Sequence, residues 1–426
     1  GTLSHEAIES VQTCDLIVLD HHLANEDLPE CHAVVNPNRQ DEIGNLSHLC
    51  AAAVIFLCLV EMRRLLRVSN EKSPDLMNML DLVALATIAD VAPLIGVNRA
   101  FVRQGLKILA QRKRVGLAAL SDQIKIDQTL SAYHLGFLLG PRINAGGRIG
   151  KPDLGAQLLI SQDPHTASAI AERLDQLNTE RQELEKQIKE MALVQAMHQN
   201  DTDSLAWAAG DSWHPGVLGI VASRIKETTN LPSVVIGFNG AIGKGSGRSI
   251  SGVDLGFAIQ KLVSEGLLIT GGGHKMAVGL SLFRENLEKA MYRLNEIIKK
   301  QHSSIDRTPK INIDALLLPS AATLELVELL NSAGPYGPGA KAPTFVFANM
   351  QINFLKRIGT DHLKIRFGDH SGSLDAISFK AFDNNLGQVL ENHNGRLLHL
   401  CGKLDINHWR GKRNVQLRLE DAQFAI

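Results

Sequence analysis

The triplet Asp20-His21-His22 combines side-chain types that bind divalent metal ions. It directly follows the run Cys14 to Leu19, which has the length and β-branched content of a buried parallel strand. Open α/β sheets bind ligands at the carboxyl ends of such strands, where this triplet would project. A carboxylate beside two imidazoles suits Mn²⁺ or Zn²⁺, and it can fix the tautomer of a ligating histidine. The alternative is a capping aspartate followed by two surface histidines.

Asp90 is a single acid within the apolar segment Ala84 to Leu94. Apolar residues at helical spacing from Leu76 to Val91 predict a helix that ends near this aspartate, before Pro93. The side chain could cap the end of that helix. It could also supply a second metal carboxylate, because phosphodiester hydrolysis commonly uses paired metal ions bridged by carboxylates.

Three glycine-rich segments carry cations or a histidine, a combination that binds phosphate. Glycines let backbone N–H groups approach an anion, and arginine offers two parallel donors. Each segment could be an ordinary loop, and only their joint occurrence indicates a polyanionic ligand. The segments are Gly140 to Arg148, with Arg142, Asn144 and Arg148; Lys244 to Ser249, with Ser246 and Arg248; and Gly271 to His274.

Near the C-terminus, Trp409 and Arg410 begin a WRGKR segment that joins an aromatic ring to three cations. Short alternating runs on either side predict a small β-barrel after Lys310. Stacking faces and cations on a barrel bind single-stranded nucleic acid. A solvated basic hairpin is the simpler interpretation of this segment alone.

The elements that would position these residues alternate between strands and helices, as in α/β layer structures. From His165 to Met197 there is no proline or glycine, and apolar residues recur at steps of three and four. This pattern favours a long helix connecting two domains. We predict a first α/β domain over 1–163, a connecting helix over 164–200, a second α/β domain over 201–302 and the barrel over 309–426.

The composition is that of an ordinary soluble globular protein, with 426 residues, 44% hydrophobic residues and a net charge of −1. This balance excludes a wholly basic surface, so nucleic acid would have to bind local patches. No apolar run is long enough for a membrane span, and no signal peptide is present. The five cysteines lack C-x-x-C spacing, and reduced thiols in the cytoplasm explain them best.

Taken in order, these segments resemble the RecJ family of the DHH phosphoesterases. The resemblance runs from the first residues to the terminal β-rich region, and so covers essentially the whole chain. Its motifs are DHH at 20–22, ADVAPL around Asp90, GPRINAGGR from Gly140, WHPGV from Trp213 leading into GIVASR, GSGRSISG from Gly245 and GGGHKMAVGLSL from Gly271.

The resemblance implies a 5′→3′ exonuclease specific for single-stranded DNA, acting in recombination and repair with Mn²⁺ or Mg²⁺ at a two-metal site. Its fold would comprise a parallel-sheet DHH domain, the connecting helix, a DHH-associated α/β domain and an oligonucleotide-binding barrel. By position, His21 would bind metal with Asp20 orienting it, and His22 would contact the scissile phosphate. Asp90 would bind or bridge metal.

The same resemblance assigns residues and partners for DNA. The enzyme would be a cytoplasmic monomer, and a helicase or a single-strand-binding protein could load it. The implied DNA contacts are Arg142, Asn144 and Arg148 along the substrate path, Ser246 and Arg248 at the 5′ end, His274 facing the phosphate, and Trp409 and Arg410 on the barrel.

One feature departs from the family. RecJ proteins have an Asp-x-Asp element and a further Asp before the triplet, whereas only Glu6, Glu9 and Asp15 precede it here. We therefore expect an incomplete DHH domain, with roughly half the metal ligands upstream of this chain, which would be inactive alone. Two alternatives remain. One is a DHH phosphoesterase acting on short oligonucleotides or cyclic dinucleotides, which generally lacks a terminal barrel. The other is a non-catalytic single-strand-binding scaffold.

Overall fold

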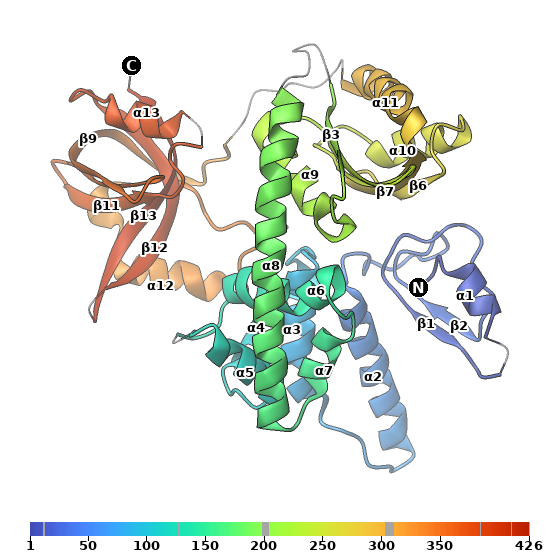
Figure 1. Cartoon of the computed structure of the whole chain (residues 1–426). Coiled ribbons are helices and arrows are strands. Elements are labelled where there is room, and N and C mark those ends of the chain that lie inside the picture. The colour runs from blue at the N-terminus through green and yellow to red at the C-terminus, as the bar shows by residue number, and fades with distance from the viewer. Residues whose placement is uncertain are drawn as a thin grey trace. The chain divides into compact units, whose positions relative to one another are not determined.

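The structure is a computed structural model that describes residues 1–11, 13–126, 128–197, 204–302, 311–383, 385–409 and 411–425 (Figure 1). The chain forms two compact units. The first comprises Gly1–Gln111, Leu130–Gly136 and Pro309–Ile426, and the second comprises Arg112–Thr129 and Phe137–Thr308. No helix among the described residues is both long and apolar enough to span a bilayer.

The first unit begins with a short parallel sheet that carries the triplet. Strand β1 (Ile17–Leu19) pairs with β2 (Ala33–Val35), so the carboxyl ends of both strands lie at the same edge. Asp20 follows β1 directly, which confirms the predicted strand and its end. Helix α1 (His5–Glu9) precedes this sheet and α2 (Ala51–Val68) follows it.

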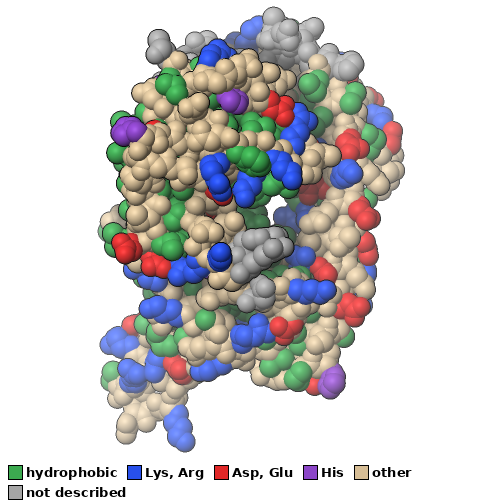
Figure 2. Space-filling model, turned by 90° about the vertical axis from the view of Figure 1, so that its left-hand side faces the viewer, with side chains coloured by type: hydrophobic (Ala, Val, Ile, Leu, Met, Phe, Trp, Pro, Cys, Tyr) green, Lys and Arg blue, Asp and Glu red, His purple; other side chains and the backbone are tan. Residues whose placement is uncertain are grey.

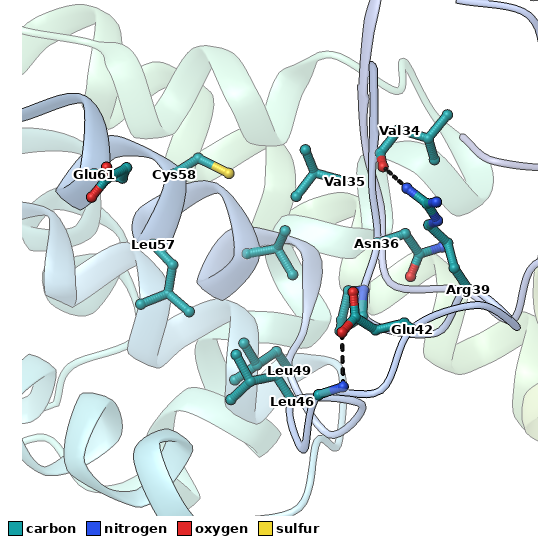
Figure 3. Close-up of a pocket in the computed structure, with 13 residues that line it drawn as sticks. Val34, Val35, Asn36, Arg39, Glu42, Leu46, Leu49, Leu57, Cys58 and Glu61 are labelled. Atoms are coloured by element: carbon teal, nitrogen blue, oxygen red, sulfur yellow. Dashed lines mark hydrogen bonds between the residues drawn. The ribbon is translucent and has the colours of Figure 1, made fainter. Parts of the chain in front are cut away.

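A hollow of about 470 Å³ lies between β2 and α2, and its walls are mainly apolar (Figure 3). At its rim, Arg39 donates to the Val34 carbonyl at 2.8 Å, and Glu42 accepts from the Gly44 amide at 2.8 Å. None of the triplet residues lines it. It is therefore separate from the candidate metal site.

Helix α3 (Leu80–Ala89) delivers Asp90, as the apolar spacing predicted. A 3-10 turn, η1 (Leu76–Met79), leads into α3, and α4 (Gly96–Leu109) follows it. Apolar residues of α3 join a core with α2 that includes Phe56, Leu80 and Val83. Asp90 is the residue at which α3 ends.

The terminal region of the first unit is a closed five-stranded barrel, which confirms the predicted fold there. Its strand order is β10–β11–β13–β12–β9, and β9 pairs back with β10. Inside it the rings of Phe347 and Phe367 meet edge to face with centroids 5.2 Å apart. The strands are β9 (Phe345–Ile358), β10 (His362–Asp369), β11 (Gly372–Ser378), β12 (Leu398–Trp409) and β13 (Lys412–Phe424), with β8 (Ala315–Leu316), α12 (Leu324–Ala333) and α13 (Leu386–Glu391) around them.

The second unit contains the predicted long helix, α8 (Pro164–Met197). Its buried residues recur at steps of three and four, and Arg181 lies among them because it pairs with Glu185 at 2.8 Å. Helices α5 (Val115–Gln123), α6 (Gly140–Ile149) and α7 (Leu154–Ile160) belong to the same unit, and η2 (His134–Leu139) precedes α6. The domain boundaries predicted from the sequence stay a prediction.

The interpretation of Gly140 to Arg148 as a loop is wrong, because these residues form helix α6. Pro141 lies in its first turn, where a missing N–H costs no hydrogen bond. Gly146 lets the next segment approach, since a Cβ there would lie 2.8 Å from the Lys151 carbonyl oxygen. The backbone amides beyond the first turn donate hydrogen bonds within the helix, so they are not free to bind an anion.

The rest of the second unit is a five-stranded sheet of order β3–β4–β5–β7–β6, in which only β3 and β4 are parallel. Val235 packs with α8 and α9 on one face of the sheet, whereas Val234 and Ile236 pack with α10 and α11 on the other. The elements are β3 (Ala206–Asp211), α9 (Pro215–Thr229), β4 (Ser233–Asn239), β5 (Ile242–Arg248), α10 (Leu255–Ser264), β6 (Thr270–His274), β7 (Ala277–Phe283) and α11 (Leu287–His302).

The second glycine-rich segment is also regular structure, since Lys244 to Arg248 lie in strand β5. The glycines alternate with polar residues, and Gly243, Gly245 and Gly247 are buried. A Cβ on Gly245 would lie 2.9 Å from Leu280 and 3.0 Å from Ile236. These glycines therefore serve close packing, while the alternate side chains point to the other face of the sheet.

Gly237→Ala is expected to destabilise the second unit by about 2 kcal/mol or more, because the new Cβ would lie 2.2 Å from the Trp213 carbonyl oxygen. Gly279→Ala in the same sheet is the matched control, since no atom lies within 4 Å of its Cβ position. The control should change stability by less than about 0.5 kcal/mol. Urea unfolding followed by circular dichroism measures both, and equal losses would contradict the packing described.

Candidate metal centre and anion-binding face

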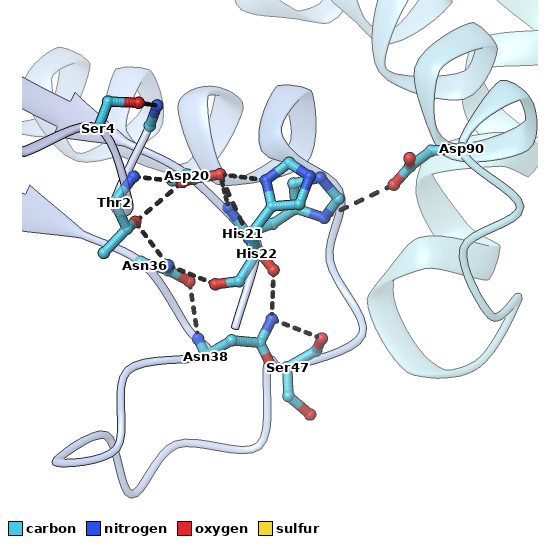
Figure 4. A network of polar contacts seen from close by, with 10 residues as sticks. Thr2, Ser4, Asp20, His21, His22, Asn36, Asn38, Ser47 and Asp90 are labelled. Atoms are coloured by element: carbon cyan, nitrogen blue, oxygen red, sulfur yellow. Dashed lines mark hydrogen bonds and ion pairs between the residues drawn. The ribbon is translucent and has the colours of Figure 1, made fainter. Parts of the chain in front are cut away.

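The carboxylate of Asp20 is buried and is surrounded by hydrogen-bond donors (Figure 4). Its Oδ2 accepts from the Thr2 amide at 2.6 Å and the Thr2 hydroxyl at 2.9 Å. Its Oδ1 accepts from the backbone amides of His21 at 2.7 Å and His22 at 3.2 Å, and contacts His22 Nδ1 at 2.7 Å. Both oxygens are committed to protein donors, so Asp20 acts as a positioning residue.

Burial raises the pKa of Asp20, but the hydrogen bonds from Thr2, His22 and His21 outweigh it and hold that pKa well below the usual range. The carboxylate is therefore ionised, and His22 must donate from Nδ1. The other ring nitrogen, Nε2, takes no part in this bond, and the His22 side chain is 61% exposed and available to a ligand. The sequence interpretation paired Asp20 with the ring of His21; the ring that it orients is that of His22.

Two asparagines that the sequence interpretation missed fix the backbone of the triplet. Asn36 Nδ2 donates to the carbonyl of His22 at 2.8 Å, and Asn38 Nδ2 donates to the carbonyl of His21 at 2.7 Å. The backbone amide of Asn38 donates to Asn36 Oδ1 at 2.8 Å. Both follow β2, the parallel neighbour of β1, so a polar NPN run at a strand end was the signal to look for.

His21 and Asp90 face each other from two different elements. His21 Nδ1 lies 3.6 Å from Asp90 Oδ2, and their side chains are 21% and 44% exposed. Burial raises the pKa of Asp90, against the lowering influence of His21 and His22. A half-buried carboxylate beside two imidazoles is a donor set that fits Mn²⁺ or a similar ion. Potential ligand atoms of Asp20, His21 and His22 all lie within 4.8 Å of one another.

In the second unit, the register of the sheet aligns the predicted phosphate-binding residues. Arg248 pairs with Ala277, which pairs with His274, and Ser246 pairs with Gly279, which pairs with Gly272. Because cross-strand partners and residues two apart lie on the same face of a sheet, Arg248, Ser246 and His274 share one face. Neither Gly279 nor Gly272 has an atom within 4 Å of its Cβ position, so the sheet here is bare backbone beside a guanidinium, a hydroxyl and an imidazole.

Arg148 on α6 belongs to the same charged region. Burial lowers the pKa of Arg248, and the positive charge of Arg148 lowers it further. Arg148 donates to the Gly216 carbonyl at 3.0 Å and Arg248 to the Gly247 carbonyl at 2.8 Å. Within the described ranges neither arginine has a carboxylate at ion-pair distance. Burial and the charge of Arg181 lower the pKa of Arg148, whereas Glu185 acts to raise it. Two neighbouring cations with no carboxylate at ion-pair distance are a candidate site for an anion.

Arg142 differs from these two arginines. Its Nε donates to Asp175 on α8 at 2.7 Å, and Nη1 donates to the Leu138 carbonyl at 2.9 Å. It therefore has internal partners and little to gain from DNA. Asn144 is only partly buried on α6.

On the barrel, the predicted contact Arg410 and the side chain of Trp409 lie outside the described residues. Strand register instead aligns an outward row across all five strands: Lys356, Lys364, Ile377, Arg418 and Lys403. Alternate residues such as Ile365 and Leu417 point into the core. Figure 2 shows Lys and Arg side chains interspersed with Asp and Glu side chains on one face of the molecule. Arg418 and Lys403 were missed because their alignment exists only across paired strands.

Asp20→Ala is expected to lower the free energy of unfolding by about 2–4 kcal/mol, since it leaves several buried donors without an acceptor. His22→Ala is the control, because that side chain is 61% exposed and contributes one of the bonds to Asp20. Its cost should stay below about 1 kcal/mol. Urea unfolding compares the two, and a similar small loss in both would show that Asp20 does not organise the triplet.

Three family models match the chain. The DHH family, N-terminal domain, matches residues 1–87, the DHHA1 domain matches 194–300, and the RecJ OB domain matches 313–421. The single-stranded-DNA-specific exonuclease RecJ of Escherichia coli (strain K12) is 35% identical, over 99% of this chain and 75% of its own length.

Two solved structures of RecJ from Thermus thermophilus are similar in fold. The complex with Mn²⁺ has a TM-score of 0.83 at 28% identity, and covers 99% of this chain and 60% of that one. The complex with Mg²⁺ has a TM-score of 0.72 at 26% identity, over 91% of this chain and 57% of that one. The chain thus spans less than two thirds of the solved chains. By its domains, its sequence and its fold, the chain belongs to the RecJ family.

Proposed function

We propose that the protein is a metal-dependent exonuclease that hydrolyses single-stranded DNA from the 5′ end, in recombination and repair. The observation that carries this proposal is the pair His21 and Asp90 beside an Asp20 that orients His22. The anion-binding face of the second unit supports a polyanionic substrate. The barrel supports a long single strand over a dinucleotide, since Lys356 and Arg418 lie in its outward row, whereas Lys364 and Lys403 of that row pair with Asp375 and Glu420.

His21 and Asp90 would hold a Mn²⁺ or Mg²⁺ ion. Such an ion, when bound, lowers the pKa of a coordinated water and polarises a phosphodiester oxygen. His22 contributes separately, because its Nδ1–H donates to Asp20 while the side chain is 61% exposed. When protonated, Nε2 would donate a hydrogen bond to the scissile phosphate or pass that proton to the leaving oxygen.

Polarity would come from the second unit. Arg148 and Arg248 would bind a terminal 5′-phosphate, with Ser246 and His274 donating hydrogen bonds to it. A terminal phosphate has more charge and more acceptor oxygens than an internal one, so paired guanidinia favour a 5′ end. Asn144 and the barrel would guide the strand by contacts that do not depend on base sequence.

We further propose a cytoplasmic monomer that works beside a helicase or a single-strand-binding protein. All five cysteines are free, which suits a reducing compartment. Exposed cations on the barrel would bind the strands that such partners release.

His21→Ala is expected to reduce Mn²⁺-dependent digestion of single-stranded DNA by about a hundredfold or more, since it removes a metal ligand. His32→Ala is the matched control, because His32 is 65% exposed and its ion-pair partner is Asp15. The assay uses the protein as its gene encodes it and counts nucleotides released from labelled strands. Unchanged activity in the first variant would overturn the assignment of the metal site.

Arg248→Ala is expected to raise KM for 5′-phosphorylated strands by roughly ten- to a hundredfold, the size of a lost charge-assisted hydrogen-bond set. kcat at saturating strand should change less. Arg293→Ala controls for charge, because Arg293 already pairs with Glu265 at 2.7 Å. The measurement is the KM for strands with and without a 5′-phosphate. An equal increase for both substrates would contradict binding of the 5′-phosphate by Arg248.

A further inference from the structure

The turn that presents Asp90 is strained. The Val91 amide donates to the Ile88 carbonyl at 3.1 Å and the Ala92 amide donates to the Thr87 carbonyl at 3.0 Å, the bond pattern of a Schellman motif. Val91 takes the left-handed position with φ of 58°. Glycine normally occupies this position, because a β-branched side chain is strained at positive φ. The turn therefore needs support from its surroundings.

Support comes from residues 333–340, here termed the docking loop, which follow α12. The Leu94 amide donates to the Pro338 carbonyl at 2.6 Å. Leu94 is fully buried, and a Cβ on Gly337 would lie 2.9 Å from its Cδ1. Gly339, with φ of 74°, comes similarly close, since a Cβ there would lie 3.1 Å from Pro93 Cβ. Pro93 and Leu94, which follow Asp90, thus pack directly against the backbone of the docking loop.

Two arginines of α4 anchor the docking loop. Arg103 donates from Nε to the Gly334 carbonyl at 3.0 Å and from Nη2 to the Ala333 carbonyl at 3.3 Å. Arg99 donates to the Ala333 carbonyl as well. These carbonyls lie at the C-terminal end of α12, where a helix leaves acceptors without internal donors and carries partial negative charge. The positive charges of Arg99 and Arg103 are therefore attracted to this end of α12.

We infer that the docking loop is a positioning element for the metal centre, which holds the strained turn so that Asp90 faces His21. The inference rests on the proposed function, because Asp90, the side chain that the loop positions, is a proposed metal ligand. The geometry of the metal site would then depend on residues in the terminal region of the chain. The barrel region would then act on catalysis through Leu94 and the turn, apart from any contact with DNA.

Gly337→Val tests this, because the added side chain must displace Leu94. Hydrogen exchange of the amides of Val91, Ala92 and Leu94 should accelerate, and the Kd for Mn²⁺, measured by electron paramagnetic resonance, should rise roughly ten- to a hundredfold. Arg103→Ala should act in the same direction and Arg103→Lys should restore part of the loss. KM for the DNA strand should stay near the wild-type value.

Leu390→Ala is the control, since Leu390 is fully buried in the apolar core of the barrel, a cluster that contains no residue of the docking loop. It should destabilise the barrel while leaving both readouts unchanged. Wild-type exchange and Mn²⁺ affinity in Gly337→Val would overturn the inference, as would equal changes in Leu390→Ala. A wild-type protein that binds no Mn²⁺ would refute the proposed function, whereas the exchange data would still decide whether the docking loop holds the turn.

Discussion

The metal centre depends on how the buried charge of Asp20 is satisfied. A carboxylate removed from water is stable only when donors surround it, and here Thr2, His21 and His22 supply them. Those same bonds use both carboxylate oxygens. The negative charge that a divalent ion needs must then come from elsewhere, and Asp90 is the acid that faces His21. The end of helix α3 thereby becomes as important to the site as the triplet itself.

The parts of this arrangement that follow from local sequence were predictable. The apolar run before Asp20, the helical spacing before Asp90 and the uninterrupted periodicity of α8 each depend on neighbours along the chain. Alternating runs likewise predicted the barrel. Hydrophobic periodicity reports which face of an element is buried, so it determines where an element ends and which residue it delivers.

The glycine-rich segments show why the rest could not be predicted. Glycine permits either the approach of an anion or the approach of another part of the chain, and the sequence does not distinguish them. In β5 the glycines pack against Ile236 and Leu280, and the proposed binding residues are the side chains between them. Asn36 and Asn38 were missed for a related reason, since their role exists only once β2 lies beside β1.

The ion-pair partners of each arginine distinguish the arginines proposed to bind DNA from the structural ones. Arg142 and Arg357 each have a carboxylate at hydrogen-bond distance, so a phosphate would have to compete with a partner that is already bound. Arg148 and Arg248 instead bond backbone carbonyls and raise each other's electrostatic potential. Such an arrangement costs free energy in the isolated protein, and an anion relieves it. A cation kept near another cation, without an acid, is therefore a stronger indication of a phosphate site than the number of cations in a segment.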